Sequence, residues 1–134
     1  MVRFNKLYLP LFLGRVPAGF PSPADDYIDK TIDLNELMVK RPAATFFVRA
    51  SGDSMLGAGI HTGDILVVDR SINPASRMIV VVHLNGEFMV KRLVIQKGLQ
   101  QLVSENPKYK SRTITESDEF EIWGVVTYVV HPAK

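Results

Sequence analysis

The sequence contains no cysteine. Disulfides, thiolate nucleophiles and cysteine-ligated zinc are therefore excluded from its chemistry. It also lacks an uninterrupted apolar run of the roughly 18 residues that a transmembrane helix requires, so we expect no membrane span. A Walker loop, a dinucleotide-binding glycine motif, metal-ligand spacing and a helix-turn-helix pattern are missing too. We therefore expect no cofactor, no metal and no direct sequence-specific binding of DNA.

What is present is an ordinary globular composition with an uneven charge. The 134 residues are 46% hydrophobic and 22% charged, which is typical of one folded domain. Arg3, Lys6 and Arg15 give the segment 1–18 a charge of +3, whereas the segment 19–134 carries a net −1. The basic character therefore belongs to the N-terminal arm, and we expect the body of the protein to bind DNA poorly.

The segment 1–40 is predicted to form an arm. Four prolines and two glycines in residues 1–23 exclude a long helix and indicate an extended chain, whose apolar stretch 7–13 we expect to lie against another surface. A short helix is predicted around residues 33–40. Asp33 supplies its N-cap, Glu36 has the position of a capping-box acid, and Pro42 stops it.

Residues 41–134 are predicted to form a β-rich catalytic domain. Stretches rich in β-branched and aromatic residues predict six strands, at 45–50, 65–68, 78–82, 88–95, 100–104 and 120–130. The pair Asn85-Gly86 predicts a tight hairpin, because both residues tolerate a positive φ angle. Short strands at close spacing indicate a mainly β, antiparallel and partly closed fold with one or two short helices.

The N-terminal arm contains a bond that is suited to proteolysis. Small side chains flank the Ala18–Gly19 bond, and nearby prolines favour an extended, accessible chain. A basic start, a short apolar core and Val16-Pro17-Ala18 also have the form of a secretory signal that is cleaved after Ala18. The apolar core is at the short limit for such a signal and contains Pro10. Both interpretations place the cut at the same bond.

One candidate for catalysis is the stretch from Ser51 to Met55, Ser-Gly-Asp-Ser-Met. A turn after a strand can present the Ser54 hydroxyl at the edge of a sheet. If a helical turn begins at Ser54, backbone amides near Asp53 and Ser54 could hold an oxyanion. The alternative is a helix cap or a plain turn, which is the commoner role of a lone serine.

A second candidate is Lys91, in the apolar strand 88–93. Alternation along a strand places it on one face with Met89 and Leu93. Desolvation there would lower the pKa of its amine and make it a competent base for a serine hydroxyl. Arg92 cannot take this role because its guanidinium stays protonated. The alternative is a lysine on an edge strand that reaches water.

A histidine-based triad is the competing chemistry. His61, His83 and His131 are available as bases, with Asp64 or Asp69 to orient them. Their spacing singles out none of them.

Several blocks in this order and spacing resemble the LexA/UmuD-type self-cleaving Ser/Lys proteases of the SOS response, in particular the SOS-mutagenesis branch. The resemblance covers nearly the whole chain, and its blocks are residues 19–27, 32–37, 51–55, 63–69, 86–93 and 123–126. It implies that Ser54 is the nucleophile, that Lys91 is the general base, and that Ala18–Gly19 is the bond the protein cuts in its own arm.

The resemblance also implies partners. It implies a cytoplasmic homodimer whose self-cleavage is stimulated by the RecA filament on single-stranded DNA. The truncated dimer then serves an error-prone, UmuC-like Y-family polymerase as accessory subunit in translesion synthesis. Because the arm before the first core strand is too short for a DNA-binding domain, we do not expect a repressor. Two alternatives stay open: a non-catalytic β-domain that binds partners under control of its arm, and an exported protein trimmed by signal peptidase.

Overall fold

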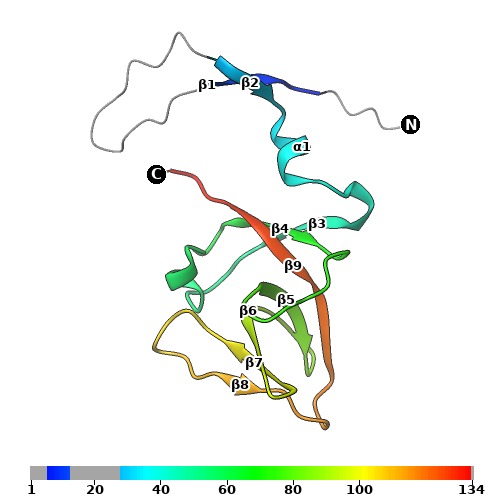
Figure 1. Ribbon diagram of the computed structural model, residues 1–134. Coiled ribbons are helices and arrows are strands. Elements are labelled where there is room, and N and C mark those ends of the chain that lie inside the picture. The colour runs from blue at the N-terminus through cyan, green and yellow to red at the C-terminus, as the bar shows by residue number, and fades with distance from the viewer. Residues whose placement is uncertain (1–5, 13–27, 134) are drawn as a thin grey trace. The chain divides into compact units, whose positions relative to one another are not determined.

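The computed structural model describes residues 6–12 and 28–133 and divides the chain into two compact units, residues 1–40 and 41–134 (Figure 1). Both units are built mainly from antiparallel strands. Within the described ranges, no helix is long and apolar enough to cross a membrane.

The first unit contains a two-stranded sheet that the sequence did not predict. Strand β1 (Leu9–Phe12) pairs antiparallel with β2 (Ile28–Ile32), with Pro10 opposite Thr31. Both strands are edge strands, where a proline can be accommodated despite its missing N–H. The arm is extended as expected over residues 9–12, where it forms a β-strand paired with β2. Ala18 and Gly19 lie outside the described residues, between β1 and β2 in sequence.

The predicted short helix is confirmed as α1 (Leu34–Met38). The Asp33 side chain caps it by accepting a 2.9 Å hydrogen bond from the N–H of Asn35. Glu36 does not complete a capping box, because its carboxylate is engaged by Lys6 at 2.9 Å and by the Tyr8 hydroxyl at 2.8 Å. The helix ends at Met38, short of Pro42.

The second unit is one seven-stranded sheet. Its strand order is β3-β4-β9-β5-β6-β7-β8, and every pair is antiparallel. The elements are η1 (Pro42–Ala44), β3 (Thr45–Arg49), η2 (Leu56–Ala58), β4 (Ile65–Asp69), β5 (Ile79–Leu84), β6 (Glu87–Gln96), β7 (Leu99–Val103), β8 (Arg112–Thr113) and β9 (Phe120–Val130).

The mainly β, antiparallel architecture is thus confirmed, and all six predicted strands are present. The very short β8 was not predicted. The sheet does not close, since β3 and β8 end the strand order. The hairpin at Asn85-Gly86 is confirmed as well: it joins β5 to β6 with φ angles of 48° and 87°.

The core of this unit consists of two apolar clusters. The side chains of β5 point alternately into one cluster and into the other. Val81 packs with Leu66 and Met55, whereas Val80 and Val82 pack with Leu93 and other residues in the second cluster. Side chains of consecutive strand residues point to opposite faces, so a single strand supplies both clusters. The long β9 pairs with β4 on one side and with β5 on the other, and so joins the two parts of the sheet.

A close backbone approach occurs where β9 passes β4. A Cβ atom on Gly124 would lie 2.6 Å from Cγ1 of Val68 and 3.2 Å from the carbonyl oxygen of Asp69. Val68 is fully buried, so its side chain has little room to move. This crossing therefore requires a residue without a side chain.

Gly124→Ala is expected to lower the free energy of unfolding by about 1–3 kcal/mol, because it overpacks the crossing. The measurement is chemical denaturation. Glu121→Ala, at an exposed position of the same strand, is the matched control and is expected to change stability by less than about 0.5 kcal/mol. Equal effects of the two variants would contradict a steric requirement at Gly124.

Candidate active site

Ser54 lies in the loop that connects β3 to η2. The loop is anchored by Met55, whose side chain is buried, and the Ser54 side chain itself is half-buried. The helical turn expected from Ser54 begins slightly later, at Leu56. Among the hydrogen bonds of the described residues, none uses the Ser54 N–H as donor. This amide is therefore available to an incoming oxygen.

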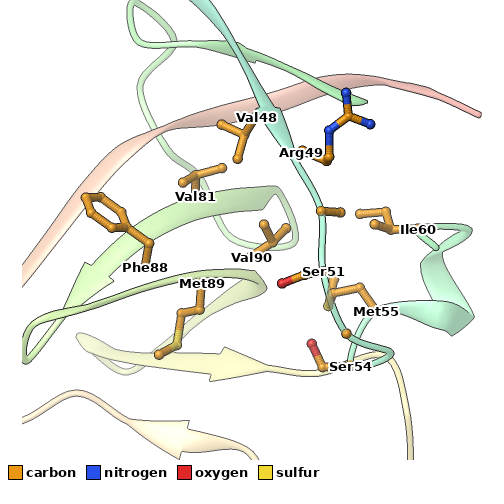
Figure 2. A pocket seen from close by; sticks show the side chains of 12 residues that line it. Val48, Arg49, Ser51, Ser54, Met55, Ile60, Val81, Phe88, Met89 and Val90 are labelled. Carbon is orange, nitrogen blue, oxygen red and sulfur yellow. The ribbon is translucent and has the colours of Figure 1, made fainter. Parts of the chain in front are cut away.

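A pocket of about 270 Å³ adjoins Ser54. Ser51 and Ser54 line it from the loop, and Met89 and Val90 line it from β6. Figure 2 shows both hydroxyl groups on the side of the loop that faces β6. The pocket thus joins a hydroxyl-bearing turn to an apolar strand.

Lys91 follows Val90 on β6 and is half-buried. Burial lowers the pKa of its amine below the usual lysine value, as the apolar strand predicted. The Lys91 Nζ donates a 2.8 Å hydrogen bond to the Ser104 hydroxyl and lies 5.5 Å from the centre of the Tyr109 ring. Burial of this amine therefore favours its neutral form.

The structure holds Ser54 and Lys91 in neighbouring pockets without a hydrogen bond between them. Lys91 lines a second pocket, of about 370 Å³, and Met89 lines both. Within residues 6–12 and 28–133, the side-chain hydrogen bond of Lys91 goes to Ser104. The two candidate residues are therefore near the same stretch of β6, but they are not joined to each other.

The segment Ser104–Tyr109, which follows β7, contacts both candidates and was not found from the sequence. The Ser104 hydroxyl accepts the hydrogen bond from Lys91. The Asn106 side chain donates a 2.8 Å hydrogen bond to the carbonyl oxygen of Asp53, next to Ser54. The carbonyl of Glu105 accepts a 2.7 Å bond from the N–H of Gly57. The segment and the Ser54 turn are far apart in sequence, so no local pattern reveals these contacts.

The Asp53 side chain is bound by the same segment. The Tyr109 hydroxyl donates a hydrogen bond to its carboxylate, and Lys108 lies 3.4 Å from it. The bond from Tyr109, followed by the contact with Lys108, lowers the pKa of Asp53, and the same bond raises the pKa of Tyr109. Asp53 is therefore ionised at neutral pH, and its side chain fastens the Ser54 turn.

The histidine-based triad is not assembled in the described part of the chain. His131 and His61 both face Asp64, and His83 lies against Phe88 with ring centroids 4.6 Å apart and planes inclined by 54°. No serine or threonine hydroxyl there forms a hydrogen bond with an imidazole. The other proposed orienter, Asp69, instead accepts hydrogen bonds from Ser71 and Arg41.

Comparison with known proteins identifies the family. The sequence model of a family described as Peptidase S24-like matches residues 10–127. The chain belongs to this family. The S24 assignment supports a serine peptidase of the self-cleaving kind and confirms the resemblance found in the sequence. It does not by itself identify the catalytic residues.

Individual relatives match most of the chain. Protein SamA of Salmonella typhimurium is 47% identical over 125 residues, which are 93% of this chain and 86% of SamA. Protein MucA of Escherichia coli is 44% identical over 128 residues, 92% of this chain and 86% of MucA. The LexA repressor of Stenotrophomonas maltophilia is 36% identical over 97% of this chain, which spans 61% of that repressor.

The contact between Asn106 and the Ser54 turn can be tested by substitution. Asn106→Ala leaves the Asp53 carbonyl without its side-chain donor, and we expect it to lower the free energy of unfolding by about 1–3 kcal/mol. Hydrogen exchange of the amides in residues 53–57 is expected to become faster. Lys108→Ala removes an exposed ion-pair partner of Asp53 and is expected to change stability by less than about 0.5 kcal/mol. Unchanged exchange in the Asn106 variant would show that the segment does not hold the turn.

Proposed function

We propose that the protein is a latent serine endopeptidase of the S24 family that cleaves its own arm between Ala18 and Gly19, with Ser54 as nucleophile and Lys91 as general base. The observation that carries the proposal is the half-buried amine of Lys91, with its lowered pKa, on the strand that lines the Ser54 pocket. A lysine is a competent base only when it is neutral, and burial favours that state.

In the first step, the neutral Lys91 amine accepts the proton of the Ser54 hydroxyl, and the serine oxygen attacks the carbonyl carbon of Ala18. The carbonyl oxygen becomes an oxyanion. The backbone N–H groups of Ser54 and Asp53 are the donors we propose for it. Loss of one such donor typically slows acyl transfer by about 10²–10³-fold.

In the second step, the tetrahedral intermediate breaks the bond between the Ala18 carbon and the Gly19 nitrogen. The protonated Lys91 gives its proton to the leaving Gly19 amine and is neutral again. Lys91 then takes a proton from water, which attacks the ester between Ala18 and Ser54, and Lys91 returns this proton to the Ser54 oxygen as the ester bond breaks. The products are residues 1–18 and a chain that begins at Gly19.

Latency is consistent with the resting geometry of Lys91. Its amine donates a hydrogen bond to Ser104, and its lone pair must still reach the Ser54 hydroxyl before it can act as a base. The arm must also enter the pocket, so the competent state is a minor one until a ligand favours it.

The resemblance to the LexA/UmuD-type proteases supports the biological setting that we propose. The RecA filament on single-stranded DNA favours the competent state in the cytoplasm. The truncated chain then acts as a homodimeric accessory subunit of an error-prone Y-family polymerase. The body that remains carries a charge of −1, so its access to DNA would come through these partners.

Ser54→Ala and Lys91→Ala are each expected to abolish formation of the fragment that begins at Gly19. The matched controls are Ser51→Ala, which removes the other hydroxyl of the pocket, and Lys110→Ala, which removes the exposed lysine beside Lys91. Both controls are expected to retain cleavage. The measurement is intact mass of the purified protein during incubation at pH 7 and pH 10.

Other outcomes of this experiment favour the alternatives. If the Ser54 variant still yields the same fragment, another protease makes the cut, and recovery of the product outside the cytoplasm would indicate signal peptidase. If the wild-type chain stays intact at both pH values, even with RecA and single-stranded DNA, the protein is a binding module whose arm controls docking.

The rate of self-cleavage is expected to rise with pH until Lys91 is fully neutral, because only the neutral amine accepts the serine proton. Since burial lowers the pKa of Lys91, this rise should lie below the pH at which a free lysine titrates. Ser104→Ala removes an acceptor that stabilises the charged amine, so it should move the pH profile further down and accelerate cleavage at pH 7. An unchanged profile would show that Ser104 does not restrain Lys91.

A further inference from the structure

The pairing of β4 with β9 brings together three side chains outside the Ser54 pocket. Ile65 is opposite Val130, so the preceding Asp64 and the following His131 lie side by side where the two strands end. His61 precedes Asp64 in a tight turn. In this turn the N–H of Asp64 donates to the carbonyl of His61 at 3.0 Å, and the N–H of His61 donates to Oδ2 of Asp64 at 2.8 Å.

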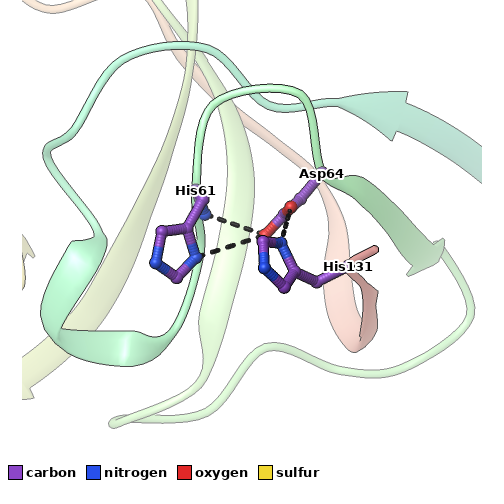
Figure 3. A group of neighbouring side chains, drawn as sticks. All are labelled: His61, Asp64 and His131. Carbon is purple, nitrogen blue, oxygen red and sulfur yellow. Dashed lines mark hydrogen bonds and ion pairs between the residues drawn. The ribbon is translucent and has the colours of Figure 1, made fainter. Parts of the chain in front are cut away.

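Both imidazole rings are directed at the same carboxylate, as Figure 3 shows. Nδ1 of His131 lies 2.6 Å from Oδ1 of Asp64, and Nδ1 of His61 lies 3.8 Å from Oδ2. The two rings stack with centroids 4.7 Å apart and planes inclined by 30°. One ligand atom from each of the three residues lies within 4.8 Å of the other two.

The buried carboxylate at this site has no permanent cation beside it among the described residues. Asp64 is 1% exposed, and its side chain accepts a hydrogen bond from the backbone N–H of His61. Its ion-pair partners in residues 28–133 are the two histidines. An imidazole, unlike a guanidinium, carries no permanent positive charge. A bound divalent cation would supply the permanent positive charge that these partners lack.

We propose that His61, Asp64 and His131 form a binding site for a divalent transition metal of the Zn²⁺ class. Two imidazole nitrogens and one carboxylate oxygen are a ligand set that Zn²⁺ accepts, with water in the fourth position. Zn²⁺ takes such ligands at about 2.0–2.2 Å, so both rings must turn, and the 2.6 Å contact between His131 and Asp64 must open to admit the ion. Both are on the surface, with side chains 51% and 45% exposed, which leaves them room to turn. When the metal binds Nδ1 of His131, that nitrogen gives up its proton, and the neutral ring carries its proton on Nε2 instead.

A metal at this site would fasten the C-terminal end of β9 to the loop that follows η2. All three ligands belong to residues 41–134, so the site persists after the arm is removed. The inference is thus independent of the proposed self-cleavage, and metal binding can be present or absent whatever the outcome at Ser54 and Lys91.

The experiment titrates ZnCl₂ into the full-length protein, prepared without a histidine tag, by calorimetry and by competition with a chromophoric chelator. The chain suits this test because it has three histidines and no cysteine. We expect one Zn²⁺ per chain and a higher Tm in its presence. His61→Ala and His131→Ala are each expected to weaken binding by at least about 10–100-fold. His83→Ala, which removes the histidine that lies against Phe88, is the matched control and should bind as the wild type does.

The Tm of each variant in EDTA verifies that it is folded, and both substituted histidines are exposed enough for the fold to persist. With Co²⁺ as the probe, the visible absorption of a tetrahedral site should appear in the wild type and in the His83 variant. Affinity for Zn²⁺ weaker than about 1 mM, or binding that His61→Ala and His131→Ala leave unchanged, would overturn the proposal and identify the cluster as an ion pair only.

Discussion

The antiparallel ladder around β9 is the constraint on which the rest of the second unit depends. This strand pairs with β4 on one side and with β5 on the other, and Gly124 allows it to pass the buried Val68. Through β5, it fixes β6 and with it the position of Lys91. Through β4, it sets Asp64 beside His131. Both the proposed catalytic site and the proposed metal site are thus consequences of strand register.

The candidate active site is held together by groups that perform no chemistry themselves. The segment Ser104–Tyr109 holds the Ser54 turn in place through hydrogen bonds to Asp53. Its Ser104 accepts a hydrogen bond from the amine of Lys91. A single segment therefore contacts Lys91 and Asp53, the residue next to Ser54. This arrangement offers a physical basis for latency, because the described residues include no hydrogen bond between the proposed base and the proposed nucleophile.

Much of the fold could be predicted from the sequence, because its signals are local. Runs of β-branched residues marked the six longer strands of the second unit, Asn85-Gly86 marked the hairpin, and Asp33 marked the start of α1. The strands β1 and β2 escaped prediction because Pro10 argues against a ladder, yet an edge strand accommodates it, and both strands of a two-stranded sheet are edges. The strand β8 is too short to leave a pattern.

For the site, the sequence by itself determined the chemistry that is available: a hydroxyl nucleophile because cysteine is missing, and an apolar strand that lowers the pKa of Lys91. The order of its blocks also identified the family. Only the tertiary structure decided which groups meet. The contacts of Lys91 with Ser104, of Asp53 with Asn106 and Tyr109, and of Asp64 with His131 join residues 13, 53, 56 and 67 positions apart. Contacts at such separations depend on sheet register and loop packing, and local periodicity carries no record of them.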